Sequence, residues 1–384
     1  MWVFLLFACN IPGVCKVGND AACPLGAVCY GGEGAKPGER GICTPYVPTV
    51  TVSTLAGSGP ATYEGGDFAD GPGAAARFNN PSGIVMDTQA RLLYVADLHN
   101  QRIRVVTLAG VVSTLAGSGE LGFVDGPGSE AAFRNPVGMA VDPKGNLYVT
   151  DYFNYRIRKV TPSGEVSTFA GSGEPGLVDG PGSVAQFDRP AGAVVDAEGN
   201  LYVTDFANHR IRKISPEGEV STLAGSGPTG EGGGGFADGP GTAARFHYPY
   251  GIAIDAKGTL YVVDAGNHRI RKISPEGEVS TLAGSGEAGF ADGDGSTAQL
   301  RYPYGMAMDA EGNLYVADTA NCRIRKVTPE GIVSTFAGSG VQGSADGPGS
   351  LAQFNVPFDV TLDKDGTLYV VDSYGHRVRK LVVE

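Results

Sequence analysis

The segment DAGNHRIRKI at 264–273 gathers residue types that could do chemistry: an aspartate, an asparagine, a histidine and two arginines. Such a group can ligate a metal, polarise a substrate or hold a turn together. The segment recurs along the chain, but other copies carry Gln101, Tyr155 or Cys322 in place of the histidine. A metal ligand cannot be exchanged in this way without loss of the site. We therefore predict a structural brace here, with no catalytic or metal centre.

The brace is expected to depend on the aspartate and on an arginine five positions later, because both occur in every copy. The pairs are Asp97/Arg102, Asp151/Arg156, Asp205/Arg210, Asp264/Arg269, Asp318/Arg323 and Asp372/Arg377. Across a tight turn, the two side chains can form an ion pair or bind backbone groups of the turn.

Glycine-rich loops suggest two further chemistries. GSGEPG at 171–176 fits the G-x-G-x-x-G pattern, but the pattern recurs in other copies and opens no helix, so no dinucleotide site is expected. Each copy also has a DG-x-G loop whose aspartate could bind calcium, best at Asp292 and Asp294. One or two carboxylates are few for an ion that takes about 6–8 oxygens. We expect no cofactor, with calcium as the lesser alternative to a plain turn role.

The elements that carry these motifs repeat with a long period. The phrase LYV-x-D ends at spacings of 54, 54, 59, 54 and 54 residues, and the longer spacing contains the insertion PTGEGGGG at 228–235. In one copy, the stretches 250–255, 259–264, 268–273 and 278–284 are short, rich in apolar and β-branched residues, and bounded by Gly, Pro, Asn or Asp. This pattern predicts four antiparallel strands in each copy and a propeller or solenoid overall.

The two ends of the repeat region distinguish a propeller from a solenoid. Residues 51–57 form a fourth strand without the three that should precede it, and the last copy has three strands and then stops. The strand at 50–57 can therefore complete the last blade and close the ring, which removes two exposed sheet edges. We predict an all-β fold: a six-bladed β-propeller of four-stranded antiparallel blades over residues 49–384.

NHRIRKI at 208–214 and 267–273, preceded by LYV-x-D and P-x-G-(I/M)-A, resembles the NHL repeat. The resemblance covers about residues 50–384 and implies a six-bladed propeller. The long GFADGPG link is similar to that of the bacterial extracellular branch. Since the family includes binding modules, sensor ectodomains and a few lyases, the resemblance does not settle function.

Function is expected where the copies differ, around the channel mouth at the start of the inner strands. One half of that ring is small or polar and the other half is aromatic. The residues flanking the prolines there are Asn80/Ser82, Asn135/Val137, Arg189/Ala191, Tyr248/Tyr250, Tyr302/Tyr304 and Val356/Phe358. We predict a ligand site formed by Tyr248, Tyr250, Tyr302, Tyr304, Phe358, Asp359, His247 and Arg301. The alternative is that these tyrosines only pack against the links.

These features favour a non-catalytic scaffold that binds a protein, peptide or carbohydrate. Related propellers include lactonases and lyases with a channel metal, so a metal-dependent hydrolase or lyase is the alternative. Only His247 among the histidines falls at the mouth, and Asp359 alone does not make a metal site. Near-identical blades also leave self-association open.

The N-terminal region indicates export. Residues 1–9 resemble a signal segment ending in a lipobox, with Cys9 as the lipidated residue, although no basic residue precedes the apolar stretch. Residues 10–48 are rich in cysteine, and Cys15, Cys23, Cys29 and Cys43 could form two disulfides in any of three pairings. We therefore predict an extracellular or surface protein that meets a membrane only through a lipid anchor.

The formal net charge of −12 disfavours nucleic acid as a partner, because the phosphate backbone would meet net repulsion. No apolar run approaches the roughly 20 residues that a transmembrane helix needs.

Overall fold

The structure is a computed structural model that describes residues 27–30, 42–45, 49–60 and 62–384. The chain divides into two units, 1–49 and 50–383. In the first unit, β1 (Ala27–Tyr30) and β2 (Ile42–Pro45) form an antiparallel hairpin in which Cys29 and Cys43 are opposite one another in the register. Cys9, Cys15 and Cys23 lie outside the described residues.

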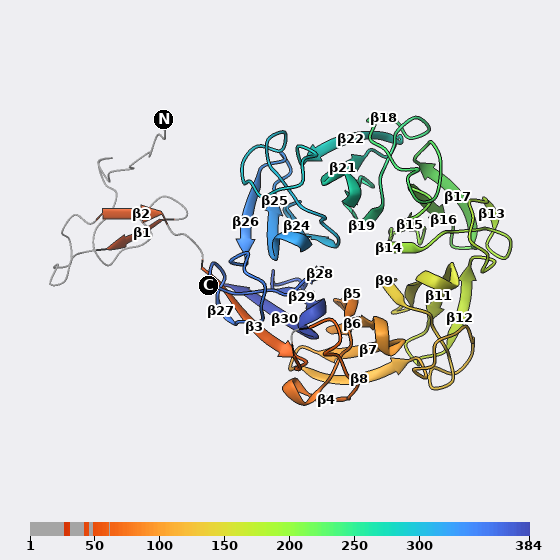
Figure 1. The fold of residues 1–384 in the computed structure, drawn as a ribbon, viewed down its shortest axis with the longest axis horizontal. Coiled ribbons are helices and arrows are strands. Elements are labelled where there is room, and N and C mark those ends of the chain that lie inside the picture. The colour runs from red at the N-terminus through yellow and green to blue at the C-terminus, as the bar shows by residue number, and fades with distance from the viewer. Residues whose placement is uncertain (1–26, 31–41, 46–48, 61) are drawn as a thin grey trace. The chain divides into compact units, whose positions relative to one another are not determined.

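The second unit is a ring of six sheets around a central axis, as predicted (Figure 1). From the axis outward, blade 1 contains β5 (Pro81–Asp87), β6 (Leu92–Asp97), β7 (Arg102–Thr107) and β8 (Val111–Ala116). Blade 2 contains β9 (Pro136–Val141), β10 (Leu147–Asp151), β11 (Arg156–Val160) and β12 (Val166–Ala170). Blade 3 contains β14 (Pro190–Val195), β15 (Leu201–Asp205), β16 (Arg210–Ile214) and β17 (Glu219–Ala224).

The remaining blades follow the same order. Blade 4 contains β19 (Pro249–Ile254), β20 (Leu260–Asp264), β21 (Arg269–Ile273) and β22 (Glu278–Ala283). Blade 5 contains β23 (Met306–Met308), β24 (Leu314–Asp318), β25 (Arg323–Val327) and β26 (Val333–Ala337). Blade 6 contains β28 (Pro357–Leu362), β29 (Leu368–Asp372) and β30 (Arg377–Val383), and it is completed by β3 (Val50–Ala56).

Ring closure occurs as predicted, because β3 pairs antiparallel with β30 from Val50 opposite Val383 to Ala56 opposite Val378. In Figure 1 the orange β3 lies beside the blue β30, which joins the two ends of the propeller chain. The first and last strands of the ring thus share one sheet, and neither leaves an unpaired edge there.

The links add a feature that the sequence analysis missed. In four blades a two-residue strand of the DG-x-G loop pairs with the outermost strand, which makes those sheets five-stranded. These strands are β4 (Gly71–Pro72), β13 (Gly180–Pro181), β18 (Gly239–Pro240) and β27 (Gly347–Pro348). In blades 2 and 5 the same contact is a single bridge, from Gly126 to Val166 and from Gly293 to Val333. The link therefore covers the outer edge of each blade.

The propeller contains short 3-10 turns. The first, η2 (Gly73–Ala75), lies in the first link, and the other five connect the second and third strands of their blades. The others are η3 (Leu98–Asn100), η4 (Tyr152–Asn154), η5 (Ala265–Asn267), η6 (Thr319–Asn321) and η7 (Ser373–Gly375). Each of these five ends at a residue in the left-handed region, such as His268 at φ 56°. The variable histidine position is therefore a backbone turn position in every copy.

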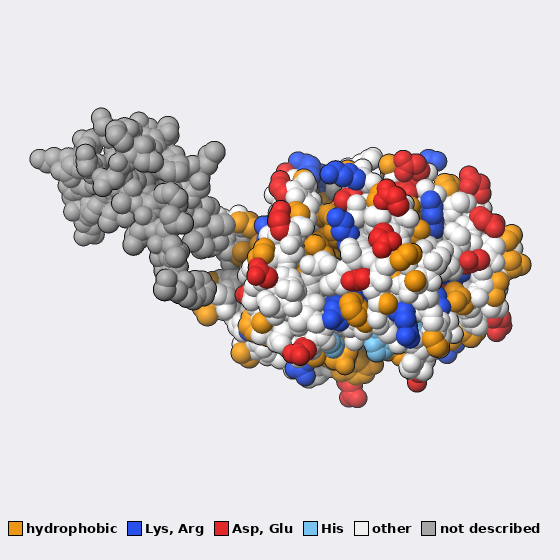
Figure 2. All heavy atoms as spheres, turned by 90° about the horizontal axis from the view of Figure 1, so that it is seen from above, with side chains coloured by type: hydrophobic (Ala, Val, Ile, Leu, Met, Phe, Trp, Pro, Cys, Tyr) orange, Lys and Arg blue, Asp and Glu red, His pale blue; other side chains and the backbone are white. Residues whose placement is uncertain are grey.

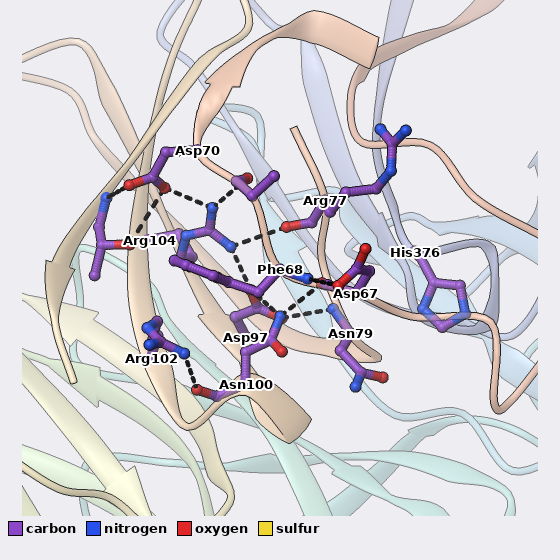
Figure 3. A network of polar contacts seen from close by, with 12 residues as sticks. Asp67, Phe68, Asp70, Arg77, Asn79, Asp97, Asn100, Arg102, Arg104 and His376 are labelled. Carbon is purple, nitrogen blue, oxygen red and sulfur yellow. Dashed lines mark hydrogen bonds and ion pairs between the residues drawn. The ribbon is translucent and has the colours of Figure 1, made fainter. Parts of the chain in front are cut away.

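A buried arginine connects each link to its blade (Figure 3). Arg104 is inaccessible to solvent and donates to the Asp97 carboxylate at 2.5 Å and to Asp70 of the link at 2.6 Å. Asp97 also accepts from the backbone N–H of Asn79 and from the Asn100 amide. Burial raises the pKa of Asp97 to about 6, against the opposing effect of Arg104. The carboxylate is thus held by one cation and two neutral donors.

Of the two roles expected for the arginine five positions after the aspartate, the structure shows the contact with backbone groups of the turn. Arg102, five positions after Asp97, donates to the carbonyls of Asn100 and Ser118 and lies 3.9 Å from the ring centroid of Phe68. It therefore binds the turn, while the next arginine on the same face forms the ion pair. The other buried trios are Asp125/Arg158/Asp151, Asp179/Arg212/Asp205, Asp238/Arg271/Asp264, Asp292/Arg325/Asp318 and Asp346/Arg379/Asp372.

Candidate functional site

A cavity of about 320 Å³ runs along the ring axis and is lined by the inner strands of all six blades. One position on each inner strand faces a neighbouring blade at close range. It is glycine in five blades and aspartate in the sixth: Gly83, Gly138, Gly192, Gly251, Gly305 and Asp359. A side chain at Gly138 would collide with the carbonyl oxygen of Ala191 in the next blade, so the strands pack backbone to backbone.

Asp359 is the exception in this ring of glycines. Its Oδ2 accepts the backbone N–H of Ile84 in blade 1 at 3.0 Å, and its Oδ1 accepts that of Val360 at 2.9 Å. Protein surrounds the carboxyl, although it remains partly accessible from the channel. Burial raises the pKa of Asp359 to about 7, against the two backbone donors, and no cation pairs with it within the described residues. Beside it, Thr361 accepts the backbone N–H of Met86 at 3.2 Å.

At the mouth, three of the predicted residues form a packed aromatic cluster. Tyr250 lies 4.8 Å from Tyr304 and 5.3 Å from Phe358 between ring centroids, and Tyr304 stacks on Phe358 at 4.8 Å. Tyr250 is only 8% exposed. Burial raises the pKa of both tyrosines. These three residues therefore pack against one another across the mouth.

The small half of the ring is filled by residues that the sequence analysis missed. Leu98, Tyr152 and Phe206, each the first residue after LYV-x-D, pack against the same cluster. Phe206 lies 5.9 Å from Tyr250 and 6.1 Å from Tyr152. Burial raises the pKa of Tyr152 to about 12. We call these six residues the plug: Leu98, Tyr152, Phe206, Tyr250, Tyr304 and Phe358.

The plug follows a size rule between two positions in each blade. Where the inner strand carries Ser82, Val137 or Ala191, the turn carries a large residue. Where the inner strand carries a large aromatic residue, the turn is small: Ala265, Thr319 or Ser373. The sequence therefore contained a signal for the plug, the opposite sizes of the inner-strand and turn residues in each blade. The signal was missed because only the residues flanking the prolines were compared.

Other predicted residues lie around the plug and are more accessible. Tyr302 is 48% exposed and its ring lies 4.6 Å from that of His268. Tyr248 and His247 stack on one another at 4.6 Å, and Tyr248 also stacks on Phe206 at 4.7 Å. Arg301 is exposed at the start of blade 5. The structure thus places Tyr248, Tyr302, His247 and Arg301 outside the plug, on the same face.

Two further exposed aromatic residues extend this face. Tyr63, in the first long link, is 53% exposed and lies 5.2 Å from Tyr374 and 5.4 Å from His99. Phe153 is 39% exposed and lies 4.9 Å from Tyr152. We call the accessible aromatic set the rim: Tyr63, Phe153, Tyr248, Tyr302 and Tyr374. Tyr248 and Tyr302 are equivalent positions, as are Phe153 and Tyr374, but the remaining blades carry non-aromatic residues or histidine there.

Two histidines attach the long links to this face. His376 accepts the backbone N–H of Asn80 through Nδ1 at 3.1 Å, and its Nε2 bonds the carbonyl of Thr62 at 2.7 Å. His209 makes the same pair of contacts, to Tyr248 N–H at 3.1 Å and to the Gly230 carbonyl at 2.9 Å. Burial lowers the pKa of both imidazoles, which favours the neutral form that these contacts require.

The part of the chain that the structure describes contains no group of three His, Cys, Asp or Glu side chains placed to hold a metal ion. Asp292, the best calcium candidate, pairs with Arg325 at 2.6 Å and accepts from Thr335. Within the same residues, no helix is long and apolar enough to cross a bilayer. Figure 2 shows acidic and basic side chains interspersed over the propeller in that view.

Comparison with known proteins defines the family. The NHL repeat matches residues 78–106, 133–160, 187–214, 246–273, 300–327 and 354–381, one segment in each blade. This chain is an NHL-repeat β-propeller. The plant protein SUPPRESSOR OF QUENCHING 1 of Arabidopsis thaliana is 32% identical over 286 residues, which cover 71% of this chain and 27% of that protein. The NHL propeller spans less than half the length of the curated relatives it matches.

Solved structures share the fold. An auxiliary nutrient binding protein from Bacteroides thetaiotaomicron aligns with a TM-score of 0.67 at 18% identity, covering 92% of this chain and 82% of that one. A gluconolactonase from Xanthomonas campestris aligns with a TM-score of 0.55 at 16% identity, covering 96% and 100%. At such identities, these matches show the fold of the NHL propeller and nothing finer.

Proposed function

We propose that this NHL propeller is a non-catalytic binding protein, exported or held at the cell surface, whose mouth face takes a protein, peptide or carbohydrate ligand. The observation that carries the proposal is the rim. Tyr63, Phe153 and Tyr302 are exposed on one face, and most other blades carry unlike residues at the positions of Phe153 and Tyr302, so ring stability does not account for them. Exposed aromatic residues with polar neighbours are typical of ligand-binding surfaces.

The nutrient-binding description of one structural neighbour supports a binding role for this fold. The lipobox-like Cys9 and the cysteines Cys15, Cys23, Cys29 and Cys43 support export, because disulfides persist in oxidising compartments. Peptide mapping of the mature protein tests both expectations: it should find a lipid on Cys9 and two disulfides among the other four. Four free thiols would contradict the export part of the proposal.

The test of the mouth face is a comparison of exposed residues on two surfaces. The full chain is screened on immobilised glycans and peptides, and any ligand found is titrated against the double variant Tyr63→Ala/Tyr302→Ala. We expect at least a tenfold loss of affinity, because a buried aromatic contact contributes about 1.4 kcal/mol or more. Leu351→Ala is the matched control, since Leu351 is 69% exposed in the link between β27 and β28 and is not a rim residue. Equal affinity of the rim variant and the control would overturn the proposal.

Asp359 favours one alternative, a hydrolase or lyase that acts in the channel. A carboxyl whose pKa is raised to about 7 has the acidity expected of a general acid or base at neutral pH. The check is hydrolysis of simple lactones by the full chain and by Asp359→Asn. Turnover that the variant abolishes would establish the enzyme and displace the binding proposal. Absence of turnover in both proteins would support the binding proposal.

A further inference from the structure

A second cavity lies between blades 3 and 4, on the face opposite the mouth. Its volume is about 680 Å³, within the range of roughly 300–1,000 Å³ that small-molecule sites occupy. Tyr202, Lys213 and Leu223 of blade 3 line it on one side, and Lys257 and Ser274 of blade 4 on the other. We call this cavity the 3–4 groove.

The 3–4 groove lies at a junction where the turn glycine before the fourth strand does not approach the preceding blade. At two other junctions the approach is close: a Cβ on Gly164 would lie 2.7 Å from the Leu115 carbonyl oxygen, and one on Gly331 would lie 2.5 Å from that of Leu282. At the junction of blades 2 and 3 it is looser, with 3.5 Å between a Cβ on Gly218 and the Phe169 carbonyl oxygen. A Cβ on Gly277 at the 3–4 junction would meet nothing within 4 Å. The gap is therefore a departure from the repeat.

Tyr202 lines the groove and packs partly against the apolar cluster that blades 3 and 4 share. The equivalent tyrosines of the other five blades are buried, and Tyr202 alone of the six is partly exposed. In blades 2 and 5, a phenylalanine of the fourth strand packs on the tyrosine: Phe169 lies 4.9 Å from Tyr148, and Phe336 lies 4.9 Å from Tyr315. In blade 3 that position is Leu223, as it is leucine in blades 1, 4 and 6, and both Leu223 and Tyr202 line the groove.

Polar groups line the groove around the tyrosine. The Tyr202 hydroxyl donates to Asp196 at 3.1 Å, and the Asn200 amide donates to the same carboxylate at 2.8 Å. The Lys213 ammonium lies 5.6 Å from the centroid of the Tyr202 ring. Glu198 belongs to no ion pair among the described residues, so its carboxylate can accept hydrogen bonds from a ligand.

From this arrangement, we propose that the 3–4 groove is a carbohydrate-binding site that takes one sugar ring of a glycan. A sugar ring has an apolar C–H face, which suits the tyrosine ring, and hydroxyl groups at its edge, which suit carboxylate, amide and ammonium partners. Both acidic and basic residues line the groove, so a ligand with both donors and acceptors fits better than a purely apolar or singly charged one. The site is separate from the mouth face and does not depend on its function.

The test fills the groove with a side chain that the fold already accepts at this position. Leu223→Phe copies the packing of blades 2 and 5 and should cover Tyr202, whereas Leu115→Phe makes the same change at the junction of blades 1 and 2. The probes are glucose, galactose, N-acetylglucosamine and their disaccharides, added to the full chain and followed by saturation-transfer NMR and calorimetry. Thermal melts confirm that both variants fold.

We expect saturable binding of at least one sugar, a loss of tenfold or more in Leu223→Phe, and unchanged affinity in Leu115→Phe. Tyr202→Ala should lose binding as well, since it removes the ring. Absence of binding up to about 10 mM sugar, or equal affinity in Leu223→Phe and the wild type, would overturn the proposal. Binding that responds to Tyr63→Ala/Tyr302→Ala and not to Leu223→Phe would also overturn it and would assign the sugar to the mouth. Peptide binding in the groove without sugar binding contradicts the ligand class.

Discussion

The brace and the mouth are formed by the same six copies, but the brace residues are identical in all copies and the mouth residues are not. In the brace, every blade repeats one buried arginine between two aspartates, as Arg104 does with Asp97 and Asp70. At the mouth, successive blades differ in side-chain size and charge. A contact present in all blades stabilises the ring, because each blade that lost it would become less stable. We therefore expect function at positions where the blades differ from one another.

The differences themselves divide into two kinds. In the plug, a small residue at one position is offset by a large one at another, as with Ala191 and Phe206, so the core stays filled. Asp359, Tyr302 and the open groove at Tyr202 have no such compensating partner. Only differences of the second kind are candidates for ligand chemistry.

The largest effect is expected from breaking one brace. Arg104→Met leaves Asp97 and Asp70 without their cation, and Asp97 is fully buried. Removing one partner of a buried ion pair costs about 3–5 kcal/mol, because the remaining charge is desolvated and unpaired. Urea denaturation should therefore show a much lower free energy of unfolding.

The control for this variant is Lys144→Ala, which changes an exposed residue in a tight turn. It should alter the free energy of unfolding by no more than about 0.5 kcal/mol. If Arg104→Met were as mild as this control, the brace would not be the contact that ties the links to the blades.

The brace also shows how far the sequence alone could lead. Repeat spacing, strand patterning and the incomplete first and last copies were enough for the six blades and the closure by β3. The sequence left open whether Arg102 pairs with Asp97 or binds the turn, because Arg102 and Arg104 lie on one face of β7 and only three-dimensional packing decides which of them reaches the buried Asp97. Proximity in sequence was a poor guide across the turn.

The candidate site was less predictable for a related reason. The predicted mouth residues do share one face, but the sequence could not show that Tyr250 and Phe358 would meet across the axis and bury one another. The 3–4 groove depends on the spacing between two sheets. The sequence does not reveal that spacing, because the glycine at position 277 is present in other copies as well.

The second prediction tests the size rule of the plug. Phe206→Ala leaves a cavity between Tyr152 and Tyr250 and should cost about 3 kcal/mol. Adding Ala191→Phe to it restores the large residue from the inner strand, as in blade 4, and should recover about half of the loss. Thermal and urea unfolding measure both variants. Additive destabilisation in the double variant would show that the two positions do not substitute for one another.

The third prediction concerns the unpaired carboxyl of the channel. Burial raises the pKa of Asp359 to about 7, so the folded chain binds this proton more tightly than the unfolded chain does. The stabilisation is present below the unfolded pKa, about 4, and is lost as pH rises through 7. Three pKa units correspond to about 4 kcal/mol, and access of solvent to the carboxyl from the channel reduces this, so wild type should lose about 1–2 kcal/mol relative to Asp359→Asn between these values. Parallel stability curves for the two proteins would contradict this.

The smallest effect is expected at the histidine contacts that hold the long links. Burial lowers the pKa of His376, with Arg377 acting in the same direction and the Thr62 carbonyl opposing. Its stabilisation is therefore present above about pH 6.5 and is lost as pH falls through the lowered pKa of the folded state. We expect wild type to exceed His376→Gln by about 1 kcal/mol at pH 7.5, and by less at pH 5.

The comparison within the ring gives this prediction its control. Blade 2 has Tyr155 at the equivalent left-handed turn position, where no imidazole titrates. Tyr155→Gln should therefore change stability by the same amount at both pH values, while His376→Gln should not. Burial and, to a lesser extent, the neighbouring His376 lower the pKa of His99, so the His376→Gln measurement is repeated with His99→Phe present. A pH dependence that survives only with His99 would assign the titration to that residue and remove it from the link contact.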